Sequence, residues 1–390
     1  MKISIITTGR ADWNGLGMLA PALRDAGHAV SVIAVGEHGN PASATAHVVR
    51  SEWPDVIVSG CGEGSVGNRA SDVLAMTAWR LEGRLEVEAP DMAVILGDRY
   101  EALCAATAAT LAGVPIAHLD GGDETIGAMD NAMRDAITKL SHLHFVCHFD
   151  HAKRVGLMGE NPDHVYVVGS THADRVLATP LLGWEDTIGR IGLGGIDRFL
   201  IVNWQPETLA TNPNGGLELI LAGLADAGPA VLFVGQNSDP GGSEATEMIK
   251  FSIREQRRRR RRRRLRFVRN LKPLTYLSAL SHCDCLIGNS SSAYFEAPYL
   301  GCWAIDVGDR QSGRRRGHLH STMRLGTSAS TMRLGTSASA IADLVSHFGQ
   351  HSAPVSRPYG DGDACKRIVD VLDRVSDPKA LLRKTFHRAG

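Results

Sequence analysis

One stretch, Gly97–Lys139, has the sequence GDRYEALCAATAATLAGVPIAHLDGGDETIGAMDNAMRDAITK and decides the fold. It follows an apolar run at Met92–Leu96 that is typical of a buried parallel strand. Its alanine-rich part predicts a buried helix that ends at Gly113, and Val114–Leu119 predicts the next strand. Strand, helix and strand in succession indicate an α/β fold, whose ligands bind at the carboxyl ends of the parallel strands.

Charged side chains come directly after both predicted strands. Asp98, Arg99 and Glu101 follow the first strand, and Asp123 follows the second in the loop HLDGGD. Because the carboxyl ends of parallel strands meet at one edge of a sheet, we expect these side chains to lie close together.

A helix is predicted next, over Asp130–Leu140, because apolar residues recur there at helical spacing. Asp130 and Arg134 are four residues apart and therefore share the opposite face near the helix start. An exposed ion pair of little consequence would have the same spacing. Because Asp98 and Asp123 are expected nearby, we favour the interpretation that Asp130 and Arg134 form a functional pair.

Several long, ordered blocks of this sequence resemble the hydrolysing UDP-N-acetylglucosamine 2-epimerases that begin sialic acid and related nonulosonic acid biosynthesis. The blocks are GDRYEALCAATAA, HLDGGDETIGAMD, RDAITKLSHLHFV, MGENPDHVYVVGS, CLIGNSSSAYFEAPYLG and DVGDRQSGR. They cover most of the chain from Met1 to about Arg314. The resemblance implies two Rossmann-like α/β domains facing a central cleft, a GT-B-like fold, a UDP-sugar substrate and no metal or other cofactor.

Length and composition suit two domains, because 390 residues with 43% hydrophobic side chains can bury two cores. We predict an N-terminal Rossmann-like domain with the catalytic carboxylates over residues 1–178, and a linker over 179–195. A C-terminal Rossmann-like UDP-binding domain is predicted over 196–363. A helical segment, 364–390, is expected to pack back on the first domain.

The resemblance implies a reaction in two stages. A carboxylate removes the proton on carbon 2 while UDP is expelled, and water then adds across the glycal to release an N-acetylmannosamine-type sugar. Asp98, Asp123 and Asp130 would transfer protons and Arg134 would orient them, and the sequence leaves open which aspartate is the base. Burial and mutual repulsion raise the pKa values of such carboxylates, and arginines stabilise the departing diphosphate.

Other turns would hold the nucleotide. Arg10 follows a predicted strand at Lys2–Thr7 and offers a positive charge beside backbone N–H groups. Gly288–Ser292 combines small residues and hydroxyls before a predicted helix, which suits a diphosphate, although serine also caps ordinary helices. The resemblance places the diphosphate on Ser290 and Ser291 and the ribose on Glu296. The full expected substrate-binding set is Arg10, Arg99, Glu101, Gln205, Asn237, Asp239, Ser290, Ser291, Glu296 and Arg310.

The sequence departs from the resembled family at several of these positions. Gln205 replaces a histidine, Asp123 replaces a glutamate, Asn131 replaces a second acid, and Asp135 replaces a histidine. Glutamine can hydrogen-bond a phosphate but cannot titrate. An altered sugar or outcome is therefore expected, and the alternative is a GT-B-like nucleotide-sugar binding protein, hydrolase or glycosyltransferase without epimerisation.

Two motifs could suggest other ligands. GEGSVG at Gly62–Gly67 has a dinucleotide-binding spacing, but a polar loop follows it and no acid follows the next strand, so we favour a loop. His142, His144, Cys147 and His148 have metal-ligand spacing. They alternate with apolar residues as a strand would, so we favour a strand and no metal.

Charge and repeats add two features. Arg257–Arg264 is a run of eight arginines, which is typical of nucleic-acid-binding tracts. The chain as a whole has 42 basic and 42 acidic residues, so we favour an exposed surface and expect no nucleic-acid partner. TMRLGTSAS, at Thr322–Ser330 and again at Thr331–Ser339, is predicted to lengthen a loop or helix.

Seven cysteines, an odd number without a paired framework, suit a reducing compartment. The start, MKISIITTGR, is predicted to be a strand and not a targeting segment, and no apolar run is long enough to span a bilayer. We expect a cytoplasmic homo-oligomer with no membrane partner.

Overall fold

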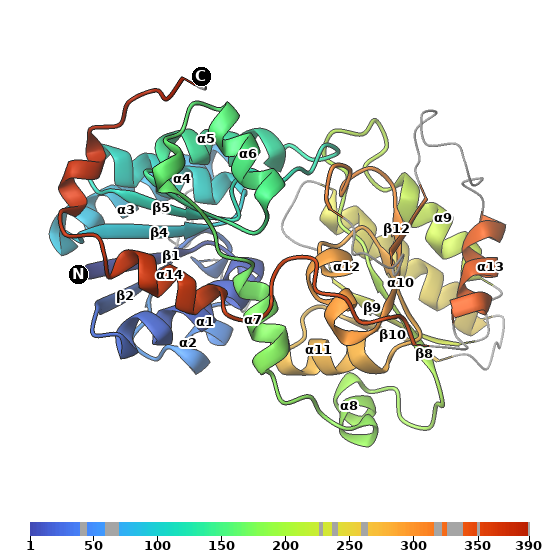
Figure 1. Cartoon of the computed structure of the whole chain (residues 1–390). Helices are drawn as coiled ribbons and strands as arrows, with labels where there is room; N and C mark the ends of the chain where they lie inside the picture. The colour runs from blue at the N-terminus through green and yellow to red at the C-terminus, as the bar shows by residue number, and fades with distance from the viewer. Residues whose placement is uncertain are drawn as a thin grey trace. The chain divides into compact units, whose positions relative to one another are not determined.

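The computed structural model describes residues 1–39, 45–58, 70–225, 229–235, 241–258, 264–315, 322–325, 338–348 and 352–388. The chain folds into two compact units, shown in Figure 1. Unit 1 comprises Met1–Asp123, Asp130–Arg175 and Tyr359–Gly390. Unit 2 comprises Glu124–Met129 and Val176–Pro358.

Unit 1 is built on a parallel seven-stranded sheet in the order β3-β2-β1-β4-β5-β6-β7. Its strands are β1 (Lys2–Thr7), β2 (Ala29–Ala34), β3 (Ile57–Val58), β4 (Met92–Leu96), β5 (Ile116–Leu119), β6 (Leu143–Val146) and β7 (Val165–Val167). The direction of winding reverses between β1 and β4, and such a switch point is where doubly wound sheets bind ligands.

Helices cover both faces of this sheet. They are α1 (Arg10–Asp25), α2 (Thr45–Glu52), α3 (Ala70–Glu88), α4 (Tyr100–Leu111), α5 (Asp130–Leu140), α6 (Phe149–Leu157), α7 (Thr171–Ala178) and α14 (Ala364–Leu372), with short 3-10 turns at Gly36–Gly39, Pro162–His164 and Pro378–Leu382. Ile5 packs with α1 and α14, whereas Ile6 packs with α3, α4 and α5. Strands buried on both faces favour apolar side chains, and β4 is apolar throughout, whereas β1 also contains the buried Ser4 and Thr7.

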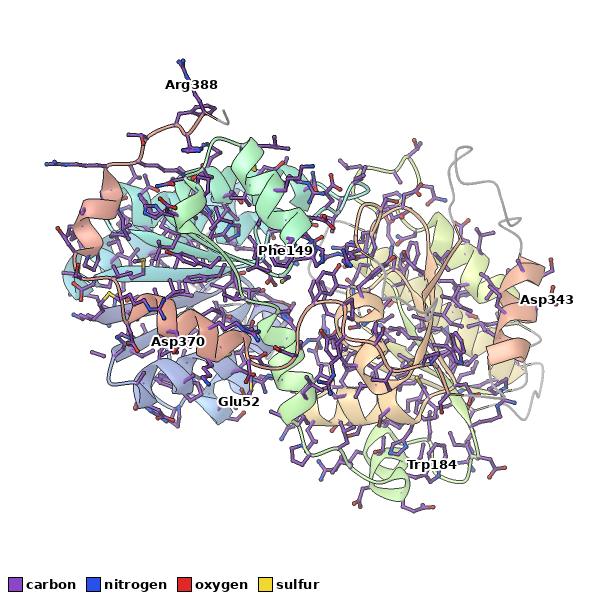
Figure 2. All side chains as sticks on the ribbon, viewed as in Figure 1. Glu52, Phe149, Trp184, Asp343, Asp370 and Arg388 are labelled. Atoms are coloured by element: carbon purple, nitrogen blue, oxygen red, sulfur yellow. The ribbon has the colours of Figure 1, made fainter. Side chains whose placement is uncertain are left out.

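The chain's C-terminal segment belongs to unit 1 because α7 anchors it there. The Asp174 carboxylate accepts the N–H groups of Ala364 and Cys365 at 3.0 and 2.7 Å, and so caps the start of α14. The next residue, Arg175, forms an ion pair at 2.8 Å with Glu52 of α2. Glu52 is labelled in Figure 2.

Unit 2 repeats the same architecture with six parallel strands in the order β10-β9-β8-β11-β12-β13. The strands are β8 (Phe199–Asn203), β9 (Ala230–Val234), β10 (Leu265–Val268), β11 (Cys285–Gly288), β12 (Trp303–Val307) and β13 (Thr322–Leu325). The helices are α8 (Trp184–Ile191), α9 (Gly215–Gly223), α10 (Gly242–Arg258), α11 (Pro273–His282), α12 (Ser292–Phe295) and α13 (Ala338–Phe348), with a 3-10 turn at Ala297–Leu300. The switch point here lies between β8 and β11.

The predicted fold class, α/β with two Rossmann-like parallel sheets, is confirmed. Some predicted elements are wrong. The expected linker 179–195 contains α8, because Thr187, Ile188 and Ile191 share one buried side of a helix. The stretch Lys379–Arg388 is not a helix beyond the 3-10 turn, since its side chains instead contact unit 1.

The first four residues of the first TMRLGTSAS copy form strand β13, which pairs with β12, and the rest of that copy lies outside the described residues. Most of the second copy, the middle of the arginine run and the Gly62–Gly67 motif lie outside the described residues. Within the described part of the chain, no helix is both long enough and apolar enough to cross a membrane.

Candidate active site

The predicted catalytic side chains of unit 1 gather around the guanidinium of Arg134. This side chain is only 2% exposed and forms an ion pair with the Asp98 carboxylate. It also donates a hydrogen bond to the main-chain carbonyl of Asp123 at 2.8 Å. A buried guanidinium needs such partners, so one residue of α5 holds together the loops that follow β4 and β5.

The two other predicted aspartates are buried beside this ion pair. Asp130 begins α5, one turn before Arg134, and is 8% exposed. Asp123 is 3% exposed, and its Oδ1 atom lies 3.4 Å from Nε2 of His151 on α6. His151 was not predicted, because its partner lies in a different sequence block.

A further carboxylate sits in the same loop. Asp120 follows β5 in the left-handed region, with φ of 63°, a conformation that few non-glycine residues adopt. The Cys147 thiol donates to its Oδ1 atom at 2.8 Å. The sequence analysis assigned no role to Asp120, although the HLDGGD motif contains it.

His118 contacts both the residue before Asp98 and α5, the helix that carries Arg134. Its Nε2 atom lies 2.9 Å from the Gly97 carbonyl oxygen, and its Nδ1 atom lies 3.2 Å from the Thr138 hydroxyl. Burial lowers the pKa of His118 to about 3, so the ring is neutral. Nε2 therefore donates to Gly97, and Nδ1 accepts from Thr138.

The switch point of unit 1 carries a second charged cluster, around Arg99. Its guanidinium pairs with Glu101 at 3.1 and 3.2 Å, and Glu101 is 1% exposed. Burial raises the pKa of Glu37, while the charges of Arg99 and Arg10 oppose that shift. Arg10 and Arg99, which were predicted to hold phosphates, are thus both close to Glu37, which was not predicted.

Local hydrogen bonds explain why Arg10 lies at this edge. The Asp12 carboxylate accepts the N–H groups of Thr8 and Gly9 at 2.7 and 2.9 Å. These bonds fix the N-cap residue Gly9 and the residue before it, so α1 begins at Arg10.

The switch point of unit 2 is fixed by one asparagine. The fully buried Asn289 accepts the Gln205 N–H at 2.7 Å and donates to the Gln205 carbonyl at 2.8 Å. Its own carbonyl accepts from Gln311 at 2.8 Å. The turns after β8, β11 and β12 are therefore tied together. The Gln205 side chain donates to Asn203 at 3.0 Å and is 5% exposed.

The predicted phosphate turn follows β11 directly. Gly288 has φ of +142°, and a Cβ atom there would lie 2.0 Å from the Asn203 carbonyl oxygen, so this close approach requires glycine. Ser290 is 9% exposed, and its hydroxyl lies 3.3 Å from that of Ser292. Ser291 is the N-cap residue of α12.

The predicted helix after this turn is short. It spans only Ser292–Phe295, and Pro298 stands in the 3-10 turn that follows. A proline cannot donate the N–H that a longer helix would need there. The macrodipole of a single turn is small, so an anion at this turn would depend mainly on hydroxyl and main-chain donors.

Glu296 is a buried acid beside the same turn. Its Oε2 atom has no hydrogen-bond partner among the described residues. Burial raises its pKa to about 7, against the opposing effects of Ser292 and Arg314. Such a group can accept hydrogen bonds from an incoming polar ligand.

Arg310 lies in a turn whose main chain is hydrogen-bonded to the side chain of Glu207. One carboxylate oxygen of Glu207 accepts the N–H groups of Asp309 and Arg310, at 2.5 and 2.9 Å. Burial raises the pKa of Glu207, while those two hydrogen bonds oppose the shift. Glu207 was missed because its partners lie about a hundred residues away in sequence.

The segment Glu124–Met129, which belongs to unit 2, packs on this same turn. The Ile126 N–H donates to the Ser312 carbonyl at 2.9 Å. A Cβ atom on Gly127 would lie 2.4 Å from the main chain of Asp309. No sequence motif indicated that the six residues between Asp123 and Asp130 would fold with the other unit.

Two groups of predictions remain. Asn237 and Asp239 lie outside the described residues. The four side chains with metal-ligand spacing have separate partners: His142 accepts from Ile116 N–H, His144 contacts Glu160, Cys147 contacts Asp120 and His148 caps α6. Across the described ranges, no three His, Cys, Asp or Glu side chains form a metal-binding group.

Comparison with known proteins places these features in context. The family model described as UDP-N-acetylglucosamine 2-epimerase matches residues 24–373. A polysialic acid biosynthesis protein of Escherichia coli is 32% identical over 230 residues, which are 58% of this chain and 57% of that protein. The GDP/UDP-N,N'-diacetylbacillosamine 2-epimerase (hydrolyzing) of Campylobacter jejuni is 30% identical over 322 residues, covering 81% and 82%.

Solved structures match the fold over almost the whole chain. The UDP-GlcNAc 2-epimerase of Methanocaldococcus jannaschii, in complex with UDP-GlcNAc and UDP, has a TM-score of 0.77 at 17% identity. The match covers 96% of this chain and 99% of that one. At this identity the likeness shows a shared GT-B-like fold.

Proposed function

Because this chain belongs to the UDP-N-acetylglucosamine 2-epimerase family, we propose that it is a hydrolysing member of that family. Family membership confirms the resemblance predicted from the sequence. In this proposal the substrate is UDP-N-acetylglucosamine or a related UDP-2-acetamido sugar. The products are UDP and the free sugar with inverted carbon 2, of the N-acetylmannosamine type.

The observation that carries the proposal is the group of carboxylates around Arg134. Asp98 pairs with this guanidinium, Asp123 accepts from it through the main chain, and Asp130 lies one turn before it on α5. Elimination from a sugar needs a carboxylate base on one side and a proton donor on another. Three acids on segments that Arg134 contacts or carries, of which Asp123 and Asp130 are buried, offer candidates for both roles.

The reaction would proceed in two balanced steps. A carboxylate takes the proton from carbon 2 while the bond from carbon 1 to the UDP oxygen breaks, which leaves a double bond between the two carbons. Water then adds its oxygen to carbon 1, and a carboxylic acid delivers a proton to the opposite face of carbon 2. Arg134 would keep the charged groups oriented through both steps.

Unit 2 would bind the nucleotide. Ser290, Ser291 and Arg310 offer hydroxyl and guanidinium donors to a diphosphate. The Oε2 atom of Glu296, which has no partner in the described part of the chain, suits the hydroxyl groups of a ribose. Arg10 and Arg99 at the switch point of unit 1 would supply further positive charge.

One observation favours the hydrolysing outcome, and a second limits which residues can transfer protons. The Campylobacter jejuni relative has hydrolysis in its name and aligns over four fifths of both chains. Gln205 has its side chain engaged with Asn203, and an amide cannot exchange protons with a substrate. Proton transfer in this chain is therefore assigned to the aspartates of unit 1.

The test is an NMR time course with UDP-N-acetylglucosamine in deuterated water. We expect free UDP together with a free 2-epimeric sugar that carries deuterium at carbon 2. A UDP-linked 2-epimer would instead show a non-hydrolysing epimerase. UDP with unlabelled N-acetylglucosamine would show simple hydrolysis. UDP binding without any turnover would support a nucleotide-sugar binding protein.

A further inference from the structure

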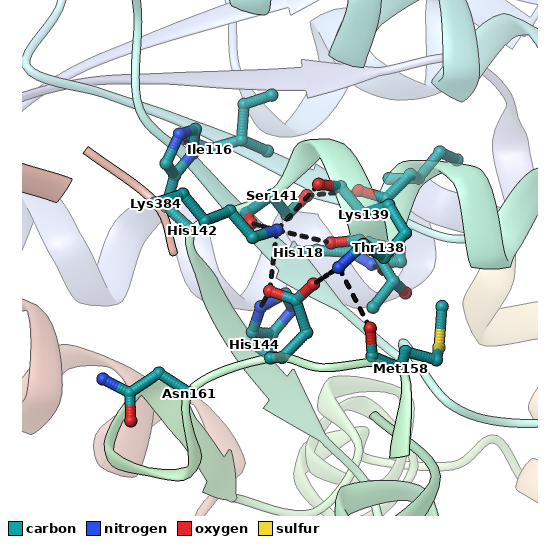
Figure 3. Close-up of polar contacts among 12 residues, drawn as sticks. Ile116, His118, Thr138, Lys139, Ser141, His142, His144, Met158, Asn161 and Lys384 are labelled. Atoms are coloured by element: carbon teal, nitrogen blue, oxygen red, sulfur yellow. Dashed lines mark hydrogen bonds and ion pairs between the residues drawn. The ribbon is translucent and has the colours of Figure 1, made fainter. Parts of the chain in front are cut away.

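The C-terminal tail contacts the last turn of α5, the helix that carries two of the proposed catalytic residues, Asp130 and Arg134. The Lys384 ammonium donates to the carbonyl oxygens of Ser141 and Lys139 at 2.6 and 2.7 Å, and lies 3.5 Å from that of Thr138 (Figure 3). These carbonyls belong to the last turn of α5 and the residue after it. The last carbonyls of a helix lack partners within the helix, and a cation there also complements the helix dipole.

A buried carboxylate holds this ammonium in place. Glu160 is 1% exposed, and its two oxygens lie 2.7 Å from Nζ of Lys384 and 2.5 Å from Nζ of Lys139. The fully buried His144 contacts it at 3.0 Å. Burial alone would raise the pKa of Glu160, but the hydrogen bonds from His144, Lys139 and Lys384 lower it to about 2. The carboxylate therefore stays charged at any ordinary pH.

The same helix turn is connected to the catalytic edge. Thr138, whose carbonyl faces Lys384, donates its hydroxyl to His118, which in turn donates to the Gly97 carbonyl. Gly97 precedes Asp98, and Arg134 lies one helical turn before Thr138. Lys384 thus contacts the end of the same helix, α5, that carries Arg134, the partner of Asp98.

We propose that Lys384 is a positioning residue of the reaction: by fixing the last turn of α5, it holds Arg134 in register with Asp98. The inference rests on the proposed function, because it assigns Lys384 a part in that chemistry. Lys384 touches no reacting atom and acts only through α5. A displacement of about 1 Å in a catalytic group is enough to lower a rate by as much as ~100-fold.

The tail has other attachments, so the role of this lysine can be isolated. The Lys379 ammonium donates to the Gly113 carbonyl at 2.9 Å, and the His387 N–H donates to the Gly159 carbonyl at 2.9 Å. Phe386 packs against Gly159, where a Cβ atom would lie 2.2 Å from its ring. Removing the Lys384 ammonium should therefore leave the tail docked.

The experiment compares three variants of the full chain. Lys384→Met removes the ammonium and keeps the length of the side chain, while Lys384→Arg keeps a cation that can reach the same carbonyls. Arg383→Met is the matched control, because it removes a neighbouring cation with an exposed side chain. The measurements are kcat and KM for UDP-N-acetylglucosamine, the Kd for UDP, and hydrogen exchange of the α5 amides.

For Lys384→Met we expect kcat to fall roughly tenfold, with KM and the UDP Kd changed less than about twofold. Amides near the end of α5 should exchange faster, Lys384→Arg should recover most of the rate, and Arg383→Met should match the unsubstituted protein. An unchanged kcat, or equal losses of kcat and UDP affinity, would overturn the inference.

Failure of the proposed function has a different signature. If the unsubstituted protein does not turn over UDP-N-acetylglucosamine, the proposed function fails and the kinetic comparison drops out. Hydrogen exchange then decides whether Lys384 fixes α5, and equal exchange in Lys384→Met and Arg383→Met would overturn that as well.

Discussion

A single buried guanidinium connects two loops and a helix in unit 1. Arg134 touches the side chain of Asp98 and the main chain of Asp123, and its own side chain has almost no access to water. Lysine could not replace it, because an ammonium is a point charge that cannot reach two loops in one plane.

Arg134→Met should therefore destabilise the protein and abolish most activity. Breaking a buried ion pair by removing one partner typically lowers the free energy of unfolding by about 3–5 kcal/mol. Because Asp98 retains 23% exposure, we expect the lower end, about 3 kcal/mol, by urea denaturation. In the double variant with Asp98→Asn the losses should be less than additive. Strict additivity would contradict the pairing.

Glu296 predicts a specific pH dependence of stability. Its folded-state pKa of about 7 lies above the ordinary 4.5, so protonation favours the folded state. That contribution is fully present below about pH 4.5 and is lost as the pH rises through about 7. The loss amounts to at most about 3 kcal/mol.

Glu296→Gln should remove this titration, so its stability relative to the unsubstituted protein should be greater at pH 8.5 than at pH 5.5. Thermal unfolding at both values measures the difference. Glu244→Gln, on the exposed start of α10, should change nothing. A Glu296→Gln difference that is the same at both pH values would show that this carboxyl is not protonated near neutrality.

At the level of residues, the sequence is informative where partners are close in the chain. Spacing within one stretch pointed to Asp98, Asp123 and Arg134, although their catalytic roles stay predictions. His118 and Glu207 were missed, since their importance depends on hydrogen bonds to main-chain groups 21 and about a hundred residues away. Such contacts leave no periodic signal in a single sequence.

Among the elements, strands buried on both faces were the easiest to predict. β4 has the predicted bounds because it is an uninterrupted apolar run, and β1 has them as well, although Ser4 and Thr7 interrupt its apolar residues. Helix ends were harder to predict, since they depend on capping groups and prolines. Asp12 fixes the start of α1 through hydrogen bonds to Thr8 and Gly9, and a 3-10 turn that contains Pro298 follows the short helix α12.

The loop element Glu124–Met129 gives a prediction that can be tested by one methyl group. In Gly127→Ala the new Cβ atom would meet the main chain of Asp309 at 2.4 Å and the Arg310 nitrogen at 2.7 Å, so the turn must shift. If Arg310 binds the diphosphate, the UDP Kd should rise about tenfold, which is roughly the loss of one charged hydrogen bond.

The matched control is Gly156→Ala on α6, where a Cβ atom would have nothing within 4 Å. Alanine in an open helical position should stabilise the protein by about 0.5–1 kcal/mol and leave UDP binding unchanged. Calorimetric titration with UDP compares the two variants. Equal affinities would argue against a role for this turn in binding the nucleotide.

On the scale of the whole molecule, the chain crosses between units more often than the sequence indicates. Residues Tyr359–Gly390 belong to unit 1, and six residues between Asp123 and Asp130 belong to unit 2. The blocks that identify the family mark both sheets, but composition does not reveal which unit a connecting segment joins. Lys384 illustrates the consequence, because it contacts a helix about 245 residues away in sequence.

Substitutions in unit 1 should lower kcat, whereas substitutions in unit 2 should weaken UDP binding. In unit 1, Asp98→Asn and Asp123→Asn should lower kcat by a factor of about 10² to 10⁴, the range for losing a general acid or base. The same variants should bind UDP with a Kd within about twofold of the unsubstituted protein, because their side chains would act on the sugar.

In unit 2, Ser290→Ala should weaken UDP binding and raise KM, with a smaller effect on kcat. Saturating UDP provides an independent readout, since a ligand at 100 times its Kd stabilises the folded state by about 2.7 kcal/mol. That thermal shift should persist in Asp98→Asn and shrink in Ser290→Ala at the same UDP concentration. If Asp98→Asn loses the shift while Ser290→Ala keeps it, nucleotide binding and proton transfer are assigned to the wrong units, and the proposed mechanism fails with them.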